Sequence, residues 1–139
     1  GQRPALAAAL GERLARAVPV RPAPDLVTAV PLHAARRRER GYNQAWLLAQ
    51  AAADHLGAPA LEGVLARVRA TPAQARLDPA RRRRNLAGAF RATEPRRVRG
   101  RRIVIVDDVL TTGATLEACL DALTAAGAHP VGAVLAWAQ

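Results

Sequence analysis

Two adjacent carboxylates follow a run of four β-branched residues in this 139-residue chain. The run from Ile103 to Val106 is apolar without interruption, which predicts a strand buried on both faces within a parallel sheet. Asp107 and Asp108 come directly after it and are expected to mark its end. Two carboxylates at the rim of a core cost free energy unless a cation, hydrogen-bond donors or hydroxyl groups meet them. The pair therefore predicts a bound ligand.

A hydroxyl-rich glycine turn stands just beyond the two acids, and a helix is predicted to begin in it. Its residues are Thr111, Thr112, Gly113, Ala114 and Thr115. The glycine permits a close approach of the backbone, and the free N–H groups and positive dipole end of a helix suit a phosphate. Acceptors for a vicinal diol beside an anion site match a ribose 5-phosphate. The alternative is purely structural, with Asp108 as a turn former and Thr112 as a helix N-cap.

This stretch resembles the ligand-binding segment of type I phosphoribosyltransferases. In that family, paired acids hold the ribose 2- and 3-hydroxyls of phosphoribosyl pyrophosphate (PRPP), the following loop wraps the 5-phosphate, and Mg²⁺ bridges the pyrophosphate. The resemblance implies that Asp107 and Asp108 bind the ribose and hold Mg²⁺ together with PRPP. It assigns the 5-phosphate to the turn from Thr111 to Thr115.

An arginine-rich segment follows the first predicted strand. It reads R-R-R-E-R-G-Y-N-Q from Arg36 to Gln44, where a phosphoribosyltransferase keeps its pyrophosphate loop. Arg40 and Gly41 are the candidates for pyrophosphate binding, because the glycine lets backbone donors approach and Arg40 lies near a helix N-terminus predicted at Asn43. The alternative is an ordinary solvated charge run.

A second arginine cluster, residues 81–84, belongs to a longer pattern, T-x-x-Q-x-x-L…R-x-x-N-x-x-G-A-F, between Thr71 and Phe90. Together with P-L-H…R-x-R-G-Y-N-Q and D-D-V-L-T-T-G-A-T, this pattern is similar to the ComF family, competence-associated relatives of phosphoribosyltransferases. The resemblance implies a mobile hood over approximately residues 71–90 that closes over the substrate, with Arg82 and Asn85 as catalytic candidates. A solvated helix face is the alternative for each arginine.

The chain departs from the family pattern in two places. ComF proteins commonly begin with a cysteine-rich zinc-binding module, and nothing precedes Gly1 to supply it, so the sequence is expected to be either a piece of a longer protein or a member without the module. The length of 139 residues, half of them apolar, suits one core, so a single phosphoribosyltransferase domain over residues 1–139 is expected. Purine-salvage phosphoribosyltransferases often carry an acid where Thr111 stands, and that acid can bind the base or help to deprotonate it. Thr111 cannot do so at neutral pH, which disfavours a purine substrate handled in that way. His33, beside the end of the first predicted strand, is the acid–base candidate, with loop solvation or packing as the alternative.

Helix and strand patterns alternate along the chain, as a parallel sheet requires. Helices are predicted over residues 4–17, 43–57, 78–84 and 113–126, and strands over 25–31, 61–69, 103–106 and 131–137, with 88–90 returning to the sheet. Right-handed crossovers place the loops after residues 31 and 108 at the same carboxyl edge. With the resemblance, this indicates a three-layer, parallel-sheet type I phosphoribosyltransferase (Rossmann-like) α/β fold.

Composition narrows the chemistry and the compartment. All 21 lysine-or-arginine positions are arginine and the formal net charge is +10, so any contact with pyrophosphate must come from arginine, backbone N–H groups or a metal ion. The single cysteine, Cys119, shares a helical face with Leu116, Leu120 and Leu123, which predicts burial, and it excludes an internal disulfide. No membrane span or signal peptide is evident, so a cytoplasmic location is expected.

The expected activity is transfer of the phosphoribosyl group of PRPP to a base or amine with release of pyrophosphate, in competence and DNA uptake. The acceptor is left open. One alternative is a non-enzymatic module that binds single-stranded DNA through its arginines, although no aromatic residues interleave the arginine runs to stack bases. Another is a PRPP sensor coupled to a protein partner, such as a competence helicase or another DNA-uptake protein.

Overall fold

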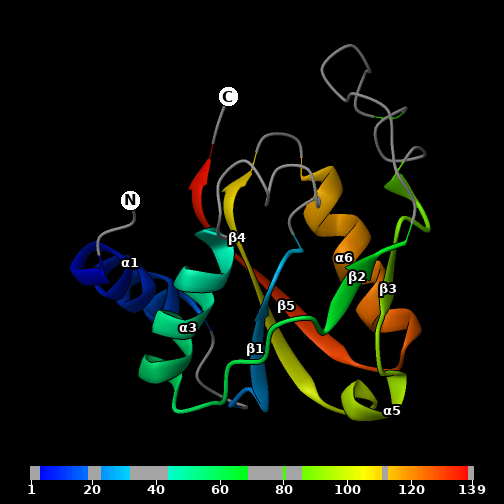
Figure 1. Ribbon diagram of the computed structural model, residues 1–139, viewed down its shortest axis with the longest axis horizontal. Helices are drawn as coiled ribbons and strands as arrows, with labels where there is room; N and C mark the ends of the chain where they lie inside the picture. Colours follow the sequence, from blue (N-terminus) through cyan, green and yellow to red (C-terminus); the bar gives the residue numbers. More distant parts are fainter. Residues whose placement is uncertain are drawn as a thin grey trace.

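The computed structural model describes residues 4–18, 23–31, 44–68, 80, 86–110 and 113–137. Figure 1 shows how its helices and strands are arranged. In chain order they are α1 (Pro4–Ala17), β1 (Leu26–Ala29), α3 (Gln44–Leu56), β2 (Leu65–Arg67), β3 (Phe90–Ala92), α5 (Pro95–Val98), β4 (Arg102–Leu110), α6 (Ala114–Ala125) and β5 (His129–Trp137). Among the described residues, no helix is both long and apolar enough to cross a bilayer.

Three parallel strands form the main sheet, in the order β1-β4-β5. In this register Ala29 of β1 lies opposite Val106 of β4. The segment after α3 extends the sheet beyond β1: the Val27 N–H donates to the Pro59 carbonyl (2.9 Å), and the Leu61 N–H donates to the Val27 carbonyl (2.9 Å). The parallel α/β sheet predicted from the sequence is confirmed.

The side chains of β4 divide the interior into two layers. Ile103 and Ile105 belong to a cluster formed with α6 and with the ribbon of β2 and β3. Val104 and Val106 belong to a second cluster, formed with α1 and α3. All four are at most 2% exposed, as expected of a strand covered on both faces. Figure 1 shows α1 and α3 on one side of the sheet and α6 with the ribbon on the other, which makes three layers.

The ribbon of β2 and β3 corrects two predictions. The strand predicted over residues 61–69 shrinks to the three residues of β2, which pair antiparallel with β3. The segment 88–90, predicted to return to the main sheet, leads into β3 and so pairs with β2 instead. The physical reason is that the ribbon buries Leu65, Phe90 and Ala92 against the α6 cluster. A two-stranded ribbon packed on a helix is stable without a place in a larger sheet.

Two glycines end helices as the sequence predicts. Gly57 follows α3 with φ of 69°, and Gly127 lies just beyond α6 with φ of 89°. After α6 the Gly127 N–H donates to the Thr124 carbonyl (2.9 Å), and the Ala128 N–H donates to the Leu123 carbonyl (3.0 Å). These bonds form a Schellman motif, which needs a left-handed residue at the glycine position. The predicted boundaries of α1, α3 and α6 hold closely, whereas the short helix α5 has no predicted counterpart.

Candidate functional site

The carboxyl ends of β1 and β4 lie side by side, as the predicted topology requires. The paired register of these strands ends at Ala29 and Val106, and the Val30 N–H donates to the Val106 carbonyl at 2.9 Å. In Figure 1 the ends of β1 and β4 and the beginnings of α3 and α6 gather at one end of the sheet. The segments that follow both strands therefore leave at the same edge, which is where parallel α/β sheets bind ligands.

Asp107 is the first residue of β4 beyond its register with β1. The expectation that the strand ends at the acid pair is wrong, because β4 continues to Leu110 and stays paired with β5 as far as Trp137. Pairing with β5 keeps the backbone extended on one side after β1 has ended on the other. The acid pair thus lies on a part of β4 that projects past β1, and Asp107 is half-buried there.

Alternation along β4 sets the face on which Asp107 lies. Side chains two apart share a face of a strand, so Asp107 lies on the face of Ile105, which packs in one cluster with Cys119 of α6. Cys119 is fully buried, as predicted. Burial raises the pKa of its thiol, and the Asp107 carboxylate raises it further. Asp107 therefore carries its charge toward the α6 layer, close to the buried sulfur.

Gly113 turns the chain into α6. Its φ of 80° lies in the left-handed region, which glycine adopts without steric strain. The Glu117 N–H donates to the Gly113 carbonyl at 2.8 Å and closes the first turn of the helix. Ala114 is buried and Thr115 is half-buried. The glycine turn and the helix start are confirmed, so the positive end of the α6 dipole follows the acid pair at the same edge.

The other predicted site residues lie outside the part of the chain that the structure describes. They are His33, Arg40 and Gly41 after β1, Arg82 and Asn85 of the hood, and Thr111 and Thr112 of the glycine turn. The cap predicted at Asn43 falls there too, as does the helix predicted over residues 78–84 apart from Ala80. The structure thus brings together the acid pair, Gly113 and the start of α6.

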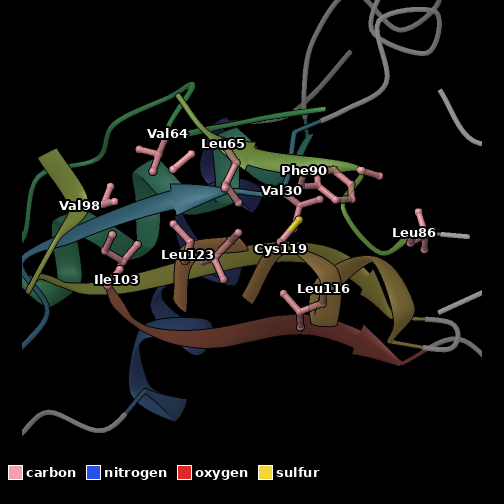
Figure 2. Close-up of a cluster of buried hydrophobic side chains, with 14 of the residues drawn as sticks. Val30, Val64, Leu65, Leu86, Phe90, Val98, Ile103, Leu116, Cys119 and Leu123 are labelled. Carbon is pink, nitrogen blue, oxygen red and sulfur yellow. The ribbon is translucent and has the colours of Figure 1, made fainter. Parts of the chain in front are cut away.

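One cation near this edge is absent from the sequence-based set of site residues. The guanidinium carbon of Arg67, the last residue of β2, lies 5.2 Å from the centre of the Phe90 ring. Its charge partly offsets the rise in the pKa of the Cys119 thiol. Cys119 and Phe90 belong to the same buried cluster, which Figure 2 shows. The sequence signal for this position is the strand alternation, which puts Arg67 on the same face as the buried Leu65.

The donors around the acid pair suit Mg²⁺ only together with a ligand. Within the described ranges, no group of three or more histidine, cysteine, aspartate or glutamate side chains could hold a metal ion by itself. Proteins commonly hold Mg²⁺ through one or two carboxylates and the phosphates of a substrate. Asp107 and Asp108 are two such carboxylates, and Mg²⁺ held by them would neutralise phosphate charge and orient a pyrophosphate.

Two cavities lie at the amino ends of the strands of the main sheet, opposite the edge that carries the acid pair. One of about 310 Å³ is lined in part by Asp25, Leu26 and Arg101, and one of about 540 Å³ in part by Arg102 and His129. Ligands of parallel α/β sheets bind at the carboxyl ends. Residues 32–43 and 111–112, which follow β1 and β4 in the sequence, lie outside the described ranges, so these cavities do not locate the site.

The model of the phosphoribosyl transferase domain family matches residues 43–139, which include the acid pair and the glycine turn. Similar curated proteins include DNA utilization protein YhgH of Salmonella typhi, 44% identical over 110 residues, and competence protein F of Haemophilus influenzae, 42% identical over 95 residues. These alignments cover 79% and 68% of the chain but 48% and 42% of the relatives. The chain therefore spans about half the length of the curated relatives it matches.

Solved structures agree with the fold. Glutamine phosphoribosylpyrophosphate amidotransferase from B. subtilis, complexed with ADP and GMP, matches with a TM-score of 0.62 and 25% identity, over 93% of this chain and 26% of that one. Adenine phosphoribosyltransferase from Leishmania tarentolae matches with a TM-score of 0.53 and 21% identity, over 93% and 56% of the respective chains. The fold class predicted from the sequence is confirmed.

Proposed function

Because this chain belongs to the phosphoribosyl transferase domain family, and within it to the ComF family, we propose that it binds PRPP with Mg²⁺ at the carboxyl edge of β1 and β4. One observation carries the proposal: the acid pair on the projecting end of β4 is followed by a left-handed Gly113 and the start of α6. Carboxylates accept hydrogen bonds from a vicinal diol, and a glycine turn at a helix start suits a phosphate. A ribose 5-phosphate needs both.

Each part of PRPP has proposed partners in this chain. Asp107 and Asp108 accept hydrogen bonds from the ribose 2- and 3-hydroxyls and contribute carboxylates to Mg²⁺. The turn from Thr111 to Thr115 and the α6 dipole hold the 5-phosphate. Arg40 and Gly41, in the segment after β1, hold the pyrophosphate with guanidinium and backbone donors.

The proposed reaction is displacement of pyrophosphate from C1 of PRPP by a base or amine. The bond from C1 to the pyrophosphate oxygen breaks, and a bond from C1 to the acceptor nitrogen forms. Positive charge develops on the ribose ring as this bond breaks. The acid pair orients the ring and stabilises that charge, while arginines stabilise the negative charge of the departing pyrophosphate. Arg82 and Asn85 are the proposed contacts from the hood, and His33 takes a proton from an acceptor that has to lose one.

A second candidate is a protein of DNA uptake that binds PRPP without turning it over. The names of the relatives, DNA utilization protein and competence protein F, favour a role in handling DNA. The net charge of +10, all from arginine, favours a polyanionic partner. In this version the site senses PRPP without cleaving it. The output is then one of two: the arginines at positions 81–84 contact single-stranded DNA, or the domain signals to a protein partner such as a competence helicase.

Calorimetric titration with PRPP and Mg²⁺ tests binding. The double variant D107N/D108N should lose PRPP binding while its circular dichroism spectrum stays unchanged. D121N is the matched control, because Asp121 is an exposed aspartate of α6 away from the acid pair. Wild-type affinity in D107N/D108N would refute the site.

Release of pyrophosphate from PRPP, measured across a panel of bases and amines, separates the two candidates. Release of pyrophosphate supports the transferase, and binding of PRPP without release supports the sensor. If PRPP is neither bound nor cleaved, both candidates are contradicted. The DNA-binding version also predicts single-strand affinity that falls steeply with salt and is lost when the arginines at positions 81–84 are replaced by glutamine. Weak binding that salt does not change would count against it.

A further inference from the structure

The ribbon of β2 and β3 has an inner and an outer face. Leu65 is in register with Ala92, and Arg67 is in register with Phe90. Directly opposed residues of an antiparallel pair share a face, so these four lie on one face, where three are buried and Arg67 is half-buried. Arg91 alternates with its neighbours, lies on the outer face and is exposed.

Arg67 therefore brings a charge to an otherwise apolar face. Its guanidinium carbon lies 5.2 Å from the centre of the Phe90 ring, within the range of a cation–π contact. Phe90 is 5% exposed, and Cys119 of the same cluster is 0% exposed. The ring thus supports the guanidinium at the end of β2, directly before the region assigned to the hood.

Asp107 reaches the same place from the sheet. It lies on the face of β4 that carries Ile105, which packs in one cluster with Phe90 and Cys119. The charges of Asp107 and Arg67 both act on the Cys119 thiol, in opposite directions. A carboxylate from the sheet and a guanidinium from the ribbon thus belong to the same layer, on the side of the sheet where Ile105, Phe90 and Cys119 pack together.

A positive neighbour matters to an acid pair of this kind. Two adjacent carboxylates repel one another, and water screens that repulsion less where one of them is half-buried, as Asp107 is. A cation on the face of one of them offsets the repulsion and restricts where that carboxylate points. Arg67 is such a cation, and its own position is fixed by the Phe90 ring.

We propose that Arg67 is a positioning residue for the ribose site: supported on Phe90, its guanidinium balances the charge of Asp107 and holds that carboxylate in place to receive the ribose of PRPP. This inference rests on the proposed function and adds to it a residue from outside the sheet. Residues 68–89 lie between Arg67 and Phe90 along the chain, so the same contact ties the base of the hood region to the ribose site.

Variants at position 67 test the role through ligand affinity. R67M keeps an unbranched side chain that can pack on Phe90 but has no charge, and R67K keeps the charge. With Mg²⁺ present, R67M should weaken binding of both PRPP and ribose 5-phosphate about tenfold, as loss of a charged partner does, while R67K recovers most of it. R91M is the matched control: it makes the same change at Arg91, which follows Phe90 in β3 and lies on the outer face of the ribbon. R91M should bind both ligands like the wild type.

Two binding results would overturn the proposal. One is wild-type affinity of R67M for both ligands. The other is a loss confined to PRPP, which would assign Arg67 to the pyrophosphate and not to the ribose carboxylate. Thermal unfolding checks that each variant is folded, and R67Q replaces R67M in the comparison if R67M does not fold.

A double-mutant cycle without ligand tests the pairing independently of PRPP. Urea unfolding is measured for the wild type, R67M, D107N and R67M/D107N. R67M should raise the unfolding equilibrium constant about fivefold more when position 107 is aspartate than when it is asparagine. Additive effects would refute the pairing. Failure of the wild type to bind PRPP or ribose 5-phosphate would refute the proposed function instead, and the cycle would still decide whether Arg67 and Asp107 act together.

Discussion

Gly11 of α1 lies against Ala51 of α3 so closely that no side chain fits between them. A β-carbon on Gly11 would lie 2.9 Å from the backbone carbonyl carbon of Ala51 and 2.9 Å from the backbone nitrogen of Ala52, and nearer still to the Ala51 β-carbon. Small residues at this crossing let the two helices meet backbone to backbone. The crossing therefore sets how α3, which begins at Gln44, packs on α1.

The first prediction concerns this crossing. G11A should destabilise the protein by up to about 2 kcal/mol, because the overpacking, about 1–3 kcal/mol, outweighs the gain of about 1 kcal/mol in helix propensity. Urea unfolding measures the change. The opposite replacement at the exposed Ala9 of the same helix, A9G, is the control and should cost about 1 kcal/mol through propensity alone. A more stable G11A would contradict the close approach.

The second prediction concerns the segment that extends the sheet beyond β1. Thr28 is fully buried, and its hydroxyl donates to the Leu61 carbonyl at 2.7 Å. T28V keeps the shape but leaves the carbonyl without this donor, so it should lower the free energy of unfolding by about 1–2 kcal/mol. In the control, T93V, the hydroxyl of the exposed Thr93 no longer donates to the Gly63 carbonyl (2.6 Å) or to the Val64 carbonyl (3.2 Å), and water can replace the bond to Gly63, which is exposed. Equal losses in the two variants would show that burial of Thr28 does not matter.

The third prediction concerns pH. Because burial raises the pKa of the Cys119 thiol above its ordinary 9.0, the folded chain favours the neutral thiol. This preference contributes its full stability below about pH 9 and loses it as the pH rises further, since only the unfolded chain then ionises. At pH 10 the wild type should therefore lose about 1 kcal/mol more stability, relative to pH 7.5, than C119A does.

Urea unfolding of both proteins at the two pH values makes this measurement. The chain suits it because all of its basic residues except histidine are arginine, which keeps its charge across this range. Parallel pH profiles for the wild type and C119A would show that the thiol does not ionise on unfolding.

The buried run of β4 and the whole of α6 could be predicted because their causes are local. A run of β-branched residues favours a strand, and Gly113 and Gly127 mark the two ends of the helix through their own backbone freedom. Cys119 was predicted to be buried from its helical spacing alone, and it is. Together these features identify the acid pair and the glycine turn without any knowledge of distant contacts.

Other features could not be predicted because they depend on partners far along the chain. The alternation around Leu65 indicates a strand but not whether its partner is β1 or β3. β4 continues past the acid pair because Val109 pairs with Ala136 of β5. Arg67 gains its place from Phe90 and from α6. The roles of His33, Arg40, Gly41, Arg82 and Asn85 stay predictions.

β1 and β4 are neighbours in the sheet but distant in the chain. The Asp25 carboxylate accepts a hydrogen bond from the Arg102 N–H at 2.8 Å across 77 positions of sequence. Contacts of such separation form only after a long loop has closed, so they slow folding. A ligand that needs segments following both strands binds no partly folded chain, and at a hundred times its Kd it would add about 2.7 kcal/mol to stability. If PRPP binds as proposed, it would therefore also stabilise the folded chain, and a cell poor in PRPP would hold a larger fraction of this protein unfolded.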